Sequence, residues 1–214
     1  MASLPMSNKR AWGTRMSVGK ILTGLAAAFV AAEAVYSVAD TSSHYLRPPG
    51  AQSEHDFLSR CIKCGKCAQA CPHYAIRIAK DFDAQVSGTP YIDAETQPCR
   101  MCPSFPCVEV CPTEALRNIV TLRDVNMGYA RISETRCIAY QGMRCEVCYR
   151  VCPLIDEAIT IDFSALEDDN IHTRFIPVID QEVCTGCGLC VQRCVVRDPR
   201  SAVRIVTLAE QEDI

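Results

Sequence analysis

The chain has 214 residues, a formal net charge of −3 and sixteen cysteines. Lysine and arginine number 22 against 25 acidic residues, a balance that excludes a surface built for nucleic acid. Aromatic residues make up only 7% of the sequence, which predicts a thin apolar core that needs covalent or metal crosslinks. Cysteine chemistry therefore has to explain the protein.

The first forty residues differ from the rest of the chain. Basic residues precede a mostly apolar run over residues 21–39, which is long enough to cross a bilayer. Small residues at 37–39 suit a signal peptidase, so we expect residues 1–40 to be a signal peptide or a membrane anchor, with membrane contact through residues 18–39. A buried alanine-rich helix is the third alternative. In the first two cases the positive-inside rule keeps the N-terminal end in the cytoplasm and sends the remainder outward across the membrane.

A linker is expected over residues 41–60, because the segment Arg47-Pro48-Pro49-Gly50 cannot continue a helix. All the cysteines follow it, in an internal repeat of four groups with four members each. The first and fourth groups have the spacing C-x2-C-x2-C-x3-C, the second has C-x2-C-x4-C-x3-C and the third has C-x7-C-x2-C-x3-C. The groups are Cys61, Cys64, Cys67 and Cys71; Cys99, Cys102, Cys107 and Cys111; Cys137, Cys145, Cys148 and Cys152; and Cys184, Cys187, Cys190 and Cys194.

This spacing suits cubane iron-sulfur clusters. Three closely spaced cysteines wrap a tight loop around one cluster, and the fourth lies one helical turn further on, aimed at a neighbouring cluster. The sequence thus predicts four [4Fe-4S] clusters, with all sixteen cysteines as iron ligands, in a domain over residues 61–214. The predicted fold class is α+β: two fused bacterial-ferredoxin-like modules behind the N-terminal signal or anchor helix. Short strands are expected over residues 75–78, 130–132, 158–161, 175–179 and 202–206.

The spacing leaves open which groups share a module. The regular first and fourth groups favour an outer module of residues 61–80 with 180–210, and the two expanded groups favour an inner module over residues 90–162. In this nested arrangement the ligand sets are Cys61, Cys64, Cys67 and Cys194; Cys184, Cys187, Cys190 and Cys71; Cys99, Cys102, Cys107 and Cys152; and Cys137, Cys145, Cys148 and Cys111. Sequential pairing, first group with second and third with fourth, is the alternative and uses the same ligands.

Other uses of cysteine fit the spacing less well. Disulfides at gaps of two and three residues would be strained, and zinc favours paired knuckles from separated segments. The sequence also carries no C-x2-C-H haem motif, no G-x-G-x-x-G loop and no nucleophile elbow, so we expect no substrate site. Cations close to the groups would collectively offset cluster charge: Lys63, Lys66, Arg100, Arg136, Arg144, Arg150, Arg193 and Arg197.

A family resemblance rests on residues around the cysteines. The segments 46–51 (LRPPGA), 142–150 (GMRCEVCYR) and 184–188 (CTGCG), with the four groups in these spacings, resemble the NapG/MauM family of ferredoxin-type proteins. The resemblance implies a periplasmic [4Fe-4S] protein and electron-transfer subunit of a quinol dehydrogenase, working with a membrane-embedded quinol-oxidising partner of NapH type. It would pass electrons through cytochrome c partners toward a periplasmic terminal reductase, typically nitrate reductase; MauM relatives belong to methylamine utilisation.

One departure from the family bears on export. Members usually carry a twin-arginine leader, whereas the nearest match here is Lys9-Arg10-Ala11-Trp12. If this variant does not serve export of a folded protein, a cytoplasmic polyferredoxin attached to the membrane is the better interpretation. Two further alternatives are a four-cluster subunit of a molybdopterin oxidoreductase and a structural zinc or disulfide module without redox activity.

Overall fold

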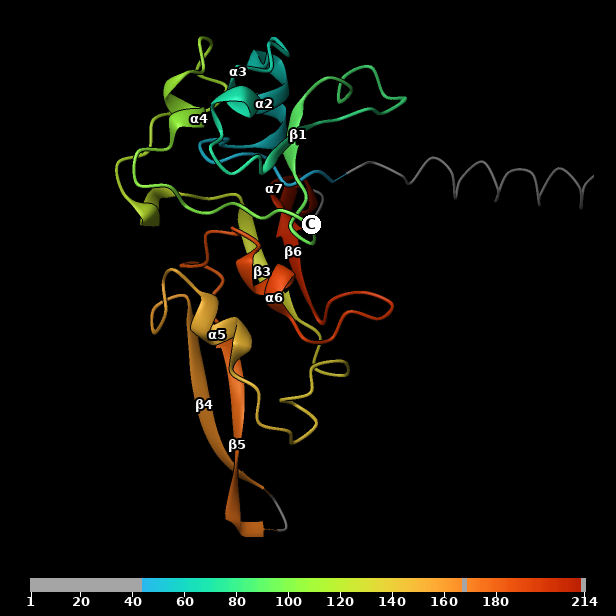
Figure 1. Cartoon of the computed structure of the whole chain (residues 1–214), viewed down its shortest axis with the longest axis vertical. Helices are drawn as coiled ribbons and strands as arrows, with labels where there is room; N and C mark the ends of the chain where they lie inside the picture. Colours follow the sequence, from blue (N-terminus) through green and yellow to red (C-terminus); the bar gives the residue numbers. More distant parts are fainter. Residues whose placement is uncertain (1–43, 167–168, 213–214) are drawn as a thin grey trace, which may run out of the picture. The chain divides into compact units, whose positions relative to one another are not determined.

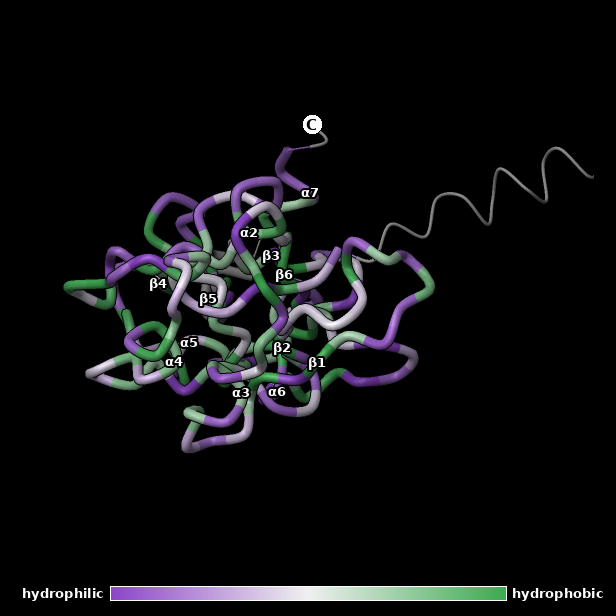
Figure 2. Tube along the Cα trace, turned by 90° about the horizontal axis from the view of Figure 1, so that it is seen from above, coloured by the Kyte–Doolittle hydropathy of each residue, from purple (hydrophilic) through white to green (hydrophobic). Residues whose placement is uncertain are grey.

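The computed structural model describes residues 44–166 and 169–212. The expected leader, with its lysine-arginine motif and the apolar run, lies outside the described residues. Within the part that is described, no helix is both long enough and apolar enough to span a membrane. Hydrophobic and hydrophilic residues alternate in short stretches along the coloured trace (Figure 2). The described chain is therefore built from many short elements.

Each cysteine group supplies one short helix, as the spacing predicts. The third cysteine of a group lies within the helix, and the fourth follows at its end, where an extended backbone begins. In the second group Pro106 occupies the first turn, a position that needs no backbone N–H donor. These helices are α3 (Lys66–Ala70), α4 (Pro106–Glu109), α5 (Val147–Val151) and α6 (Leu189–Arg193).

The strands form three antiparallel pairs, and the β3–β6 and β4–β5 pairs can be followed in Figure 1. All five strand positions expected from the sequence are confirmed, and a further strand, β2, precedes the second cysteine group. The last two strands before α6 are longer than expected because they continue outward as a hairpin beyond the cysteine loops. The pairs are β1 (Ile76–Ile78) with β2 (Pro90–Ile92), β3 (Gly128–Ile132) with β6 (Val203–Thr207), and β4 (Ile159–Leu166) with β5 (Asp169–Ile179).

Consecutive cysteine groups lie side by side. Helix α3 packs against α4, and α5 packs against α6. We name the unit of α3, α4, β1 and β2 module A, and the unit of α5, α6 and β3 to β6 module B. The nested division into an outer and an inner module is therefore wrong. The physical reason is the connection between the two groups of each module. It contains an antiparallel strand pair, β1 with β2 or β4 with β5, so the chain folds back and places the second group beside the first.

Segments outside the repeats complete the core. Helix α2 (Glu54–Arg60) is capped by Ser53, whose side chain accepts a hydrogen bond from the Asp56 N–H, and the helix buries Phe57 completely. The short helix η1 (Leu122–Asp124) lies between the modules in sequence, and α7 (Leu208–Glu212) packs against α2. Phe57, Met127 and Leu208 belong to one hydrophobic cluster, which joins module A to the C-terminal part of the described chain.

Candidate iron-sulfur sites

Four cavities in the described residues are each lined by one complete set of four cysteines. The four cavities are alike in size, with empty volumes of about 330 to 410 Å³ that include space open to solvent. In every set, three cysteines come from one group and the fourth comes from the neighbouring group of the same module. The sets are site I (Cys61, Cys64, Cys67, Cys111), site II (Cys71, Cys99, Cys102, Cys107), site III (Cys137, Cys145, Cys148, Cys194) and site IV (Cys152, Cys184, Cys187, Cys190).

These sets correct the expected nested pairing. Cys111, not Cys194, completes the set of the first group. In turn, Cys71 of the first group completes the set of the second group. In module B, Cys152 joins the fourth group and Cys194 joins the third. The rule that the fourth cysteine crosses to a neighbouring site is thus followed between consecutive groups.

A repeated backbone conformation shapes the loops. The second residue after the first cysteine is left-handed in three groups, at Lys63 (φ 57°), Met101 (φ 53°) and Gly186 (φ 70°). Such a residue reverses the local direction of the chain within a short loop. At Gly186 a glycine is required for a second reason, because a Cβ there would lie 2.6 Å from the carbonyl oxygen of Gly128.

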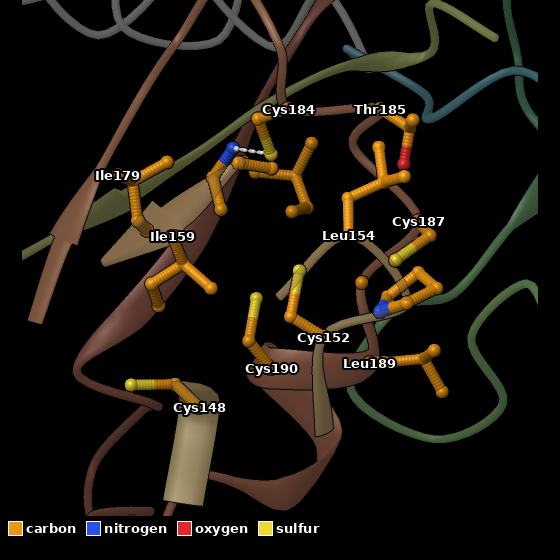
Figure 3. A pocket seen from close by; sticks show the side chains of 15 residues that line it. Cys148, Cys152, Leu154, Ile159, Ile179, Cys184, Thr185, Cys187, Leu189 and Cys190 are labelled. Carbon is orange, nitrogen blue, oxygen red and sulfur yellow. Dashed lines mark hydrogen bonds between the residues drawn. The ribbon is translucent and has the colours of Figure 1, made fainter. Parts of the chain in front are cut away.

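Site IV shows how the side chains converge. Figure 3 shows the sulfur atoms of Cys152, Cys184, Cys187 and Cys190 directed toward a common space. The backbone N–H of Ala130, on β3, donates to Cys184 Sγ at 3.3 Å. A hydrogen bond of this kind stabilises a thiolate, so β3 contributes to the site as well as to the sheet.

The same type of hydrogen bond recurs in module A. The N–H of Ala75 donates to Cys71 Sγ at 3.4 Å, and the N–H of Leu116 donates to Cys111 Sγ at 3.5 Å. Burial opposes ionisation of Cys111, but backbone donors at Leu116, Thr113 and Ala115 outweigh it and lower the pKa of the thiol. The turn after each of these two cysteines therefore points N–H groups at the sulfur.

Most of the other sulfurs lie in surroundings that favour the neutral thiol. Burial raises the pKa of Cys99, Cys107 and Cys148 to about 12, and neighbouring cysteines add to the shift. Burial likewise raises the pKa of Cys67 and Cys187 to about 11. Thiolates at these positions need a compensating positive charge within the cavity, and iron supplies one.

The donor arrangement fits a multi-iron cluster better than the alternatives. All sixteen cysteines are free rather than joined in disulfides. Within residues 44–166 and 169–212, no three side chains of metal-ligating type are placed to share a single ion. One zinc ion would draw its sulfurs to about 3.8 Å from one another. Four cysteines spread around an apolar cavity instead suit a cubane cluster with a sulfur at each iron.

The four sites are neighbours in the order I, II, IV, III. Helix α3 connects sites I and II, because it carries Cys67 and ends at Cys71. The modules meet at a backbone hydrogen bond of 3.1 Å from the N–H of Cys99 to the carbonyl oxygen of Cys187, which joins site II to site IV. Cys148 lines the cavities of both site III and site IV. The sequence order of the groups does not reveal this spatial order.

A further charged residue, Arg47, was not among the cations expected near the clusters, and it is only 1% exposed. The cations expected beside the cysteines are exposed or half-buried, whereas Arg47 is the sole buried charged residue among those the structure describes. Burial raises the pKa of Cys61, and the positive charge of Arg47 partly offsets that effect. Its place in the segment Arg47-Pro48-Pro49-Gly50 was visible in the sequence, but its burial was not.

Comparison with known proteins defines the class first. Residues 60–115 and 136–197 each match the 4Fe-4S dicluster domain family. The first range contains all of module A, and the second contains both cysteine groups of module B but not its strands β3 and β6. The chain therefore contains two 4Fe-4S dicluster ferredoxin-like domains and is an electron-transfer iron-sulfur protein. This assignment agrees with the four-cysteine cavities and with sequential pairing.

Relatives then define the family. The chain is 43% identical over 191 residues to ferredoxin-type protein NapG of Escherichia coli (strain K12), covering 88% of this chain and 83% of that protein. It is 39% identical over 174 residues to methylamine utilization ferredoxin-type protein MauM of Methylorubrum extorquens, covering 80% of this chain and 77% of that protein. The chain belongs to the NapG/MauM family of ferredoxin-type proteins.

Among solved structures, a formate dehydrogenase, heterodisulfide reductase and formylmethanofuran dehydrogenase complex from Methanospirillum hungatei aligns with a TM-score of 0.25 and 20% identity. The alignment covers 69% of this chain and 49% of that chain. This likeness is too low to carry an argument about the fold.

Proposed function

We propose that the chain relays electrons through four [4Fe-4S] clusters, one in each of sites I to IV, with all sixteen cysteines as iron ligands. When bound, such clusters supply one-electron redox chemistry. The observation that carries the proposal is the series of direct links between neighbouring sites in the order I, II, IV, III: a shared helix, a backbone hydrogen bond and a shared lining cysteine. Sites linked in this way form a path through the protein, whereas isolated structural sites need no such order.

The residues of the chain would prepare each site for this role. Apolar side chains around the cavities, such as Leu154 and Ile159 at site IV, keep water from the sulfurs. Backbone N–H donors at Ala75, Leu116 and Ala130 stabilise negative charge on sulfur. The described cavities combine cysteines with mainly apolar side chains, an arrangement suited to holding a redox group.

The proposed relay has a direction. We propose that electrons come from a membrane-embedded quinol-oxidising subunit of NapH type and leave toward a cytochrome c or a periplasmic terminal reductase such as nitrate reductase. Residues 1–40 would be the exported signal or the anchor, residues 41–60 the linker, and residues 18–39 the membrane contact. The names of the relatives support the ferredoxin-type role, and the particular partners are part of the proposal.

Anaerobic purification from the membrane fraction tests the function. We expect a brown protein with equal amounts of iron and acid-labile sulfide, paramagnetic signals after reduction with dithionite, and a co-purifying polytopic subunit. Sequencing of the mature N-terminus reports whether residues 1–40 are retained. A colourless protein without labile sulfide would contradict the cluster assignment. Co-purification with a large molybdopterin chain would instead identify the subunit of a molybdopterin oxidoreductase.

A further inference from the structure

The guanidinium of Arg47 is held in a network of hydrogen bonds beside module A. Its Nη1 donates to Thr89 Oγ1 at 2.8 Å and to the carbonyl oxygen of Pro90 at 3.0 Å. Its Nε donates to Glu54 Oε2 at 2.8 Å, and its Nη2 also pairs with that carboxylate. Because guanidinium does not lose its proton in proteins, this is a permanent positive charge in the protein interior.

The network lies directly behind the wall of site I. Phe57 and Pro90 both line the cavity that contains Cys61, Cys64, Cys67 and Cys111. The guanidinium carbon of Arg47 lies 4.8 Å from the centre of the Phe57 ring, and its Nη1 binds the Pro90 carbonyl. A single layer of side chain and backbone therefore separates the charge from the cavity, with no room for bulk water to screen it.

The countercharge occupies the other side of the guanidinium. Glu54 begins helix α2 and its side chain is 14% exposed, compared with 0% for Arg47. Solvent therefore screens the carboxylate more than the cation, while the Nη1 edge of Arg47 faces the cavity wall. Site I consequently lies in a net positive field from this pair.

We infer that Arg47 raises the reduction potential of the redox group in site I relative to the other three sites. Reduction adds one electron and thus one negative charge to a site, and a fixed buried cation stabilises that charge. Among the described residues only Arg47 is both charged and buried. Arg100 lines site II but is partly exposed, so solvent screens its charge more, and the described linings of sites III and IV contain no charged side chain. Site I lies at one end of the order I, II, IV, III. A higher reduction potential there would make site I the site at which electrons accumulate. This inference rests on the proposed function.

Charge-changing variants test the inference by the sign of their effects. In a dithionite titration followed by electron paramagnetic resonance, Cys64→Ala first identifies the signal of site I by its loss. We expect Arg47→Gln to lower the potential of that signal and Glu54→Gln to raise it. The expected size is about a tenfold change in the reduced-to-oxidised ratio at fixed potential, which equals 59 mV for a one-electron couple. Arg47→Lys keeps the charge and should stay close to the unmodified protein.

Arg204→Gln is the matched control, because Arg204 forms an ion pair with Glu210 but its side chain is 57% exposed. We expect no shift there. If Arg47→Gln does not fold, the rise in Glu54→Gln still decides the matter. Site I signals that stay unchanged in Glu54→Gln, or that move equally in Arg47→Gln and Arg47→Lys, would overturn the inference. The absence of all iron-sulfur signals in the unmodified protein would instead contradict the proposed function.

Discussion

Modules A and B build the same kind of site on different supports. In module B, β3 pairs with β6 and β4 with β5, so strands flank both cysteine groups. In module A only β1 and β2 pair, and the segments before the first group and after the second meet through a hydrogen bond of 2.9 Å from the Arg117 N–H to the Gly50 carbonyl oxygen. Helix α2 and the Arg47 network supply the remaining support.

The difference shows which features a four-cysteine site requires. Both modules keep the tight loop, the short helix with the third cysteine, and the fourth cysteine at the neighbouring site. In module A, helix α2 and the buried ion pair of Arg47 take the place of the second strand pair of module B. Local geometry at the cysteines therefore defines the sites, and the scaffold around them is free to differ in charge.

The largest expected effect comes from the cysteines that cross between groups. Cys111→Ala should remove the cluster of site I and lower the iron content by about a quarter, because an alanine leaves one iron without a ligand. Cys194→Ala should do the same at site III. Iron analysis and the paramagnetic signals check this. If Cys111→Ala abolished the signal that Cys145→Ala abolishes, sequential pairing would fail.

Removal of the buried ring of α2 should weaken module A. Phe57 is 0% exposed, and Phe57→Ala would leave a cavity beside site I, costing about 3–5 kcal/mol of unfolding free energy. Phe82→Ala is the matched control on a fully exposed ring, with an expected cost below about 0.5 kcal/mol. Anaerobic unfolding in guanidinium measures both. Equal midpoints for the two variants would show that α2 does not support the module.

Substitutions at two glycines, Gly65 in module A and Gly186 in module B, compare the cysteine loops of the two modules. Gly186→Ala combines left-handed strain with a Cβ 2.6 Å from the Gly128 carbonyl oxygen, and should cost about 1–3 kcal/mol. Gly65 has a similar φ of 71°, but nothing lies within 4 Å of its added Cβ, so Gly65→Ala should cost only about 1 kcal/mol. Thermal unfolding compares them. A larger loss for Gly65→Ala would contradict the assignment of close packing at Gly186.

The smallest effect is expected on the β4–β5 hairpin. Phe163 is 66% exposed and lies edge-on to Phe175 with ring centres 5.3 Å apart, so Phe163→Ala should cost about 0.5–1.5 kcal/mol. All paramagnetic signals should stay unchanged, since site III and site IV lie at the base of the hairpin. A changed cluster signal would mean that the outer hairpin influences the sites.

The cysteine spacing predicted much of the fold and the site. Three cysteines within a few residues, followed by a fourth after one helical turn, specify a loop and a helix because these depend on neighbouring residues alone. The strands after Cys71, Cys152 and Cys194 were likewise predicted from short apolar runs. Strand β2 was missed because it begins with Pro90, and proline argues against a strand in a sequence pattern.

The tertiary structure alone decided the rest. Similar spacing in the first and fourth groups favoured a nested pairing, yet the hairpin connections bring consecutive groups together, and spacing does not encode that return. The contact between Cys99 and Cys187, which sets the order of the sites, joins residues far apart in sequence. Arg47 was part of an expected linker in the sequence, and its burial arises only when Phe57, Thr89 and Pro90 enclose it. Bonding geometry is local, whereas burial and proximity are made by the packing of distant segments.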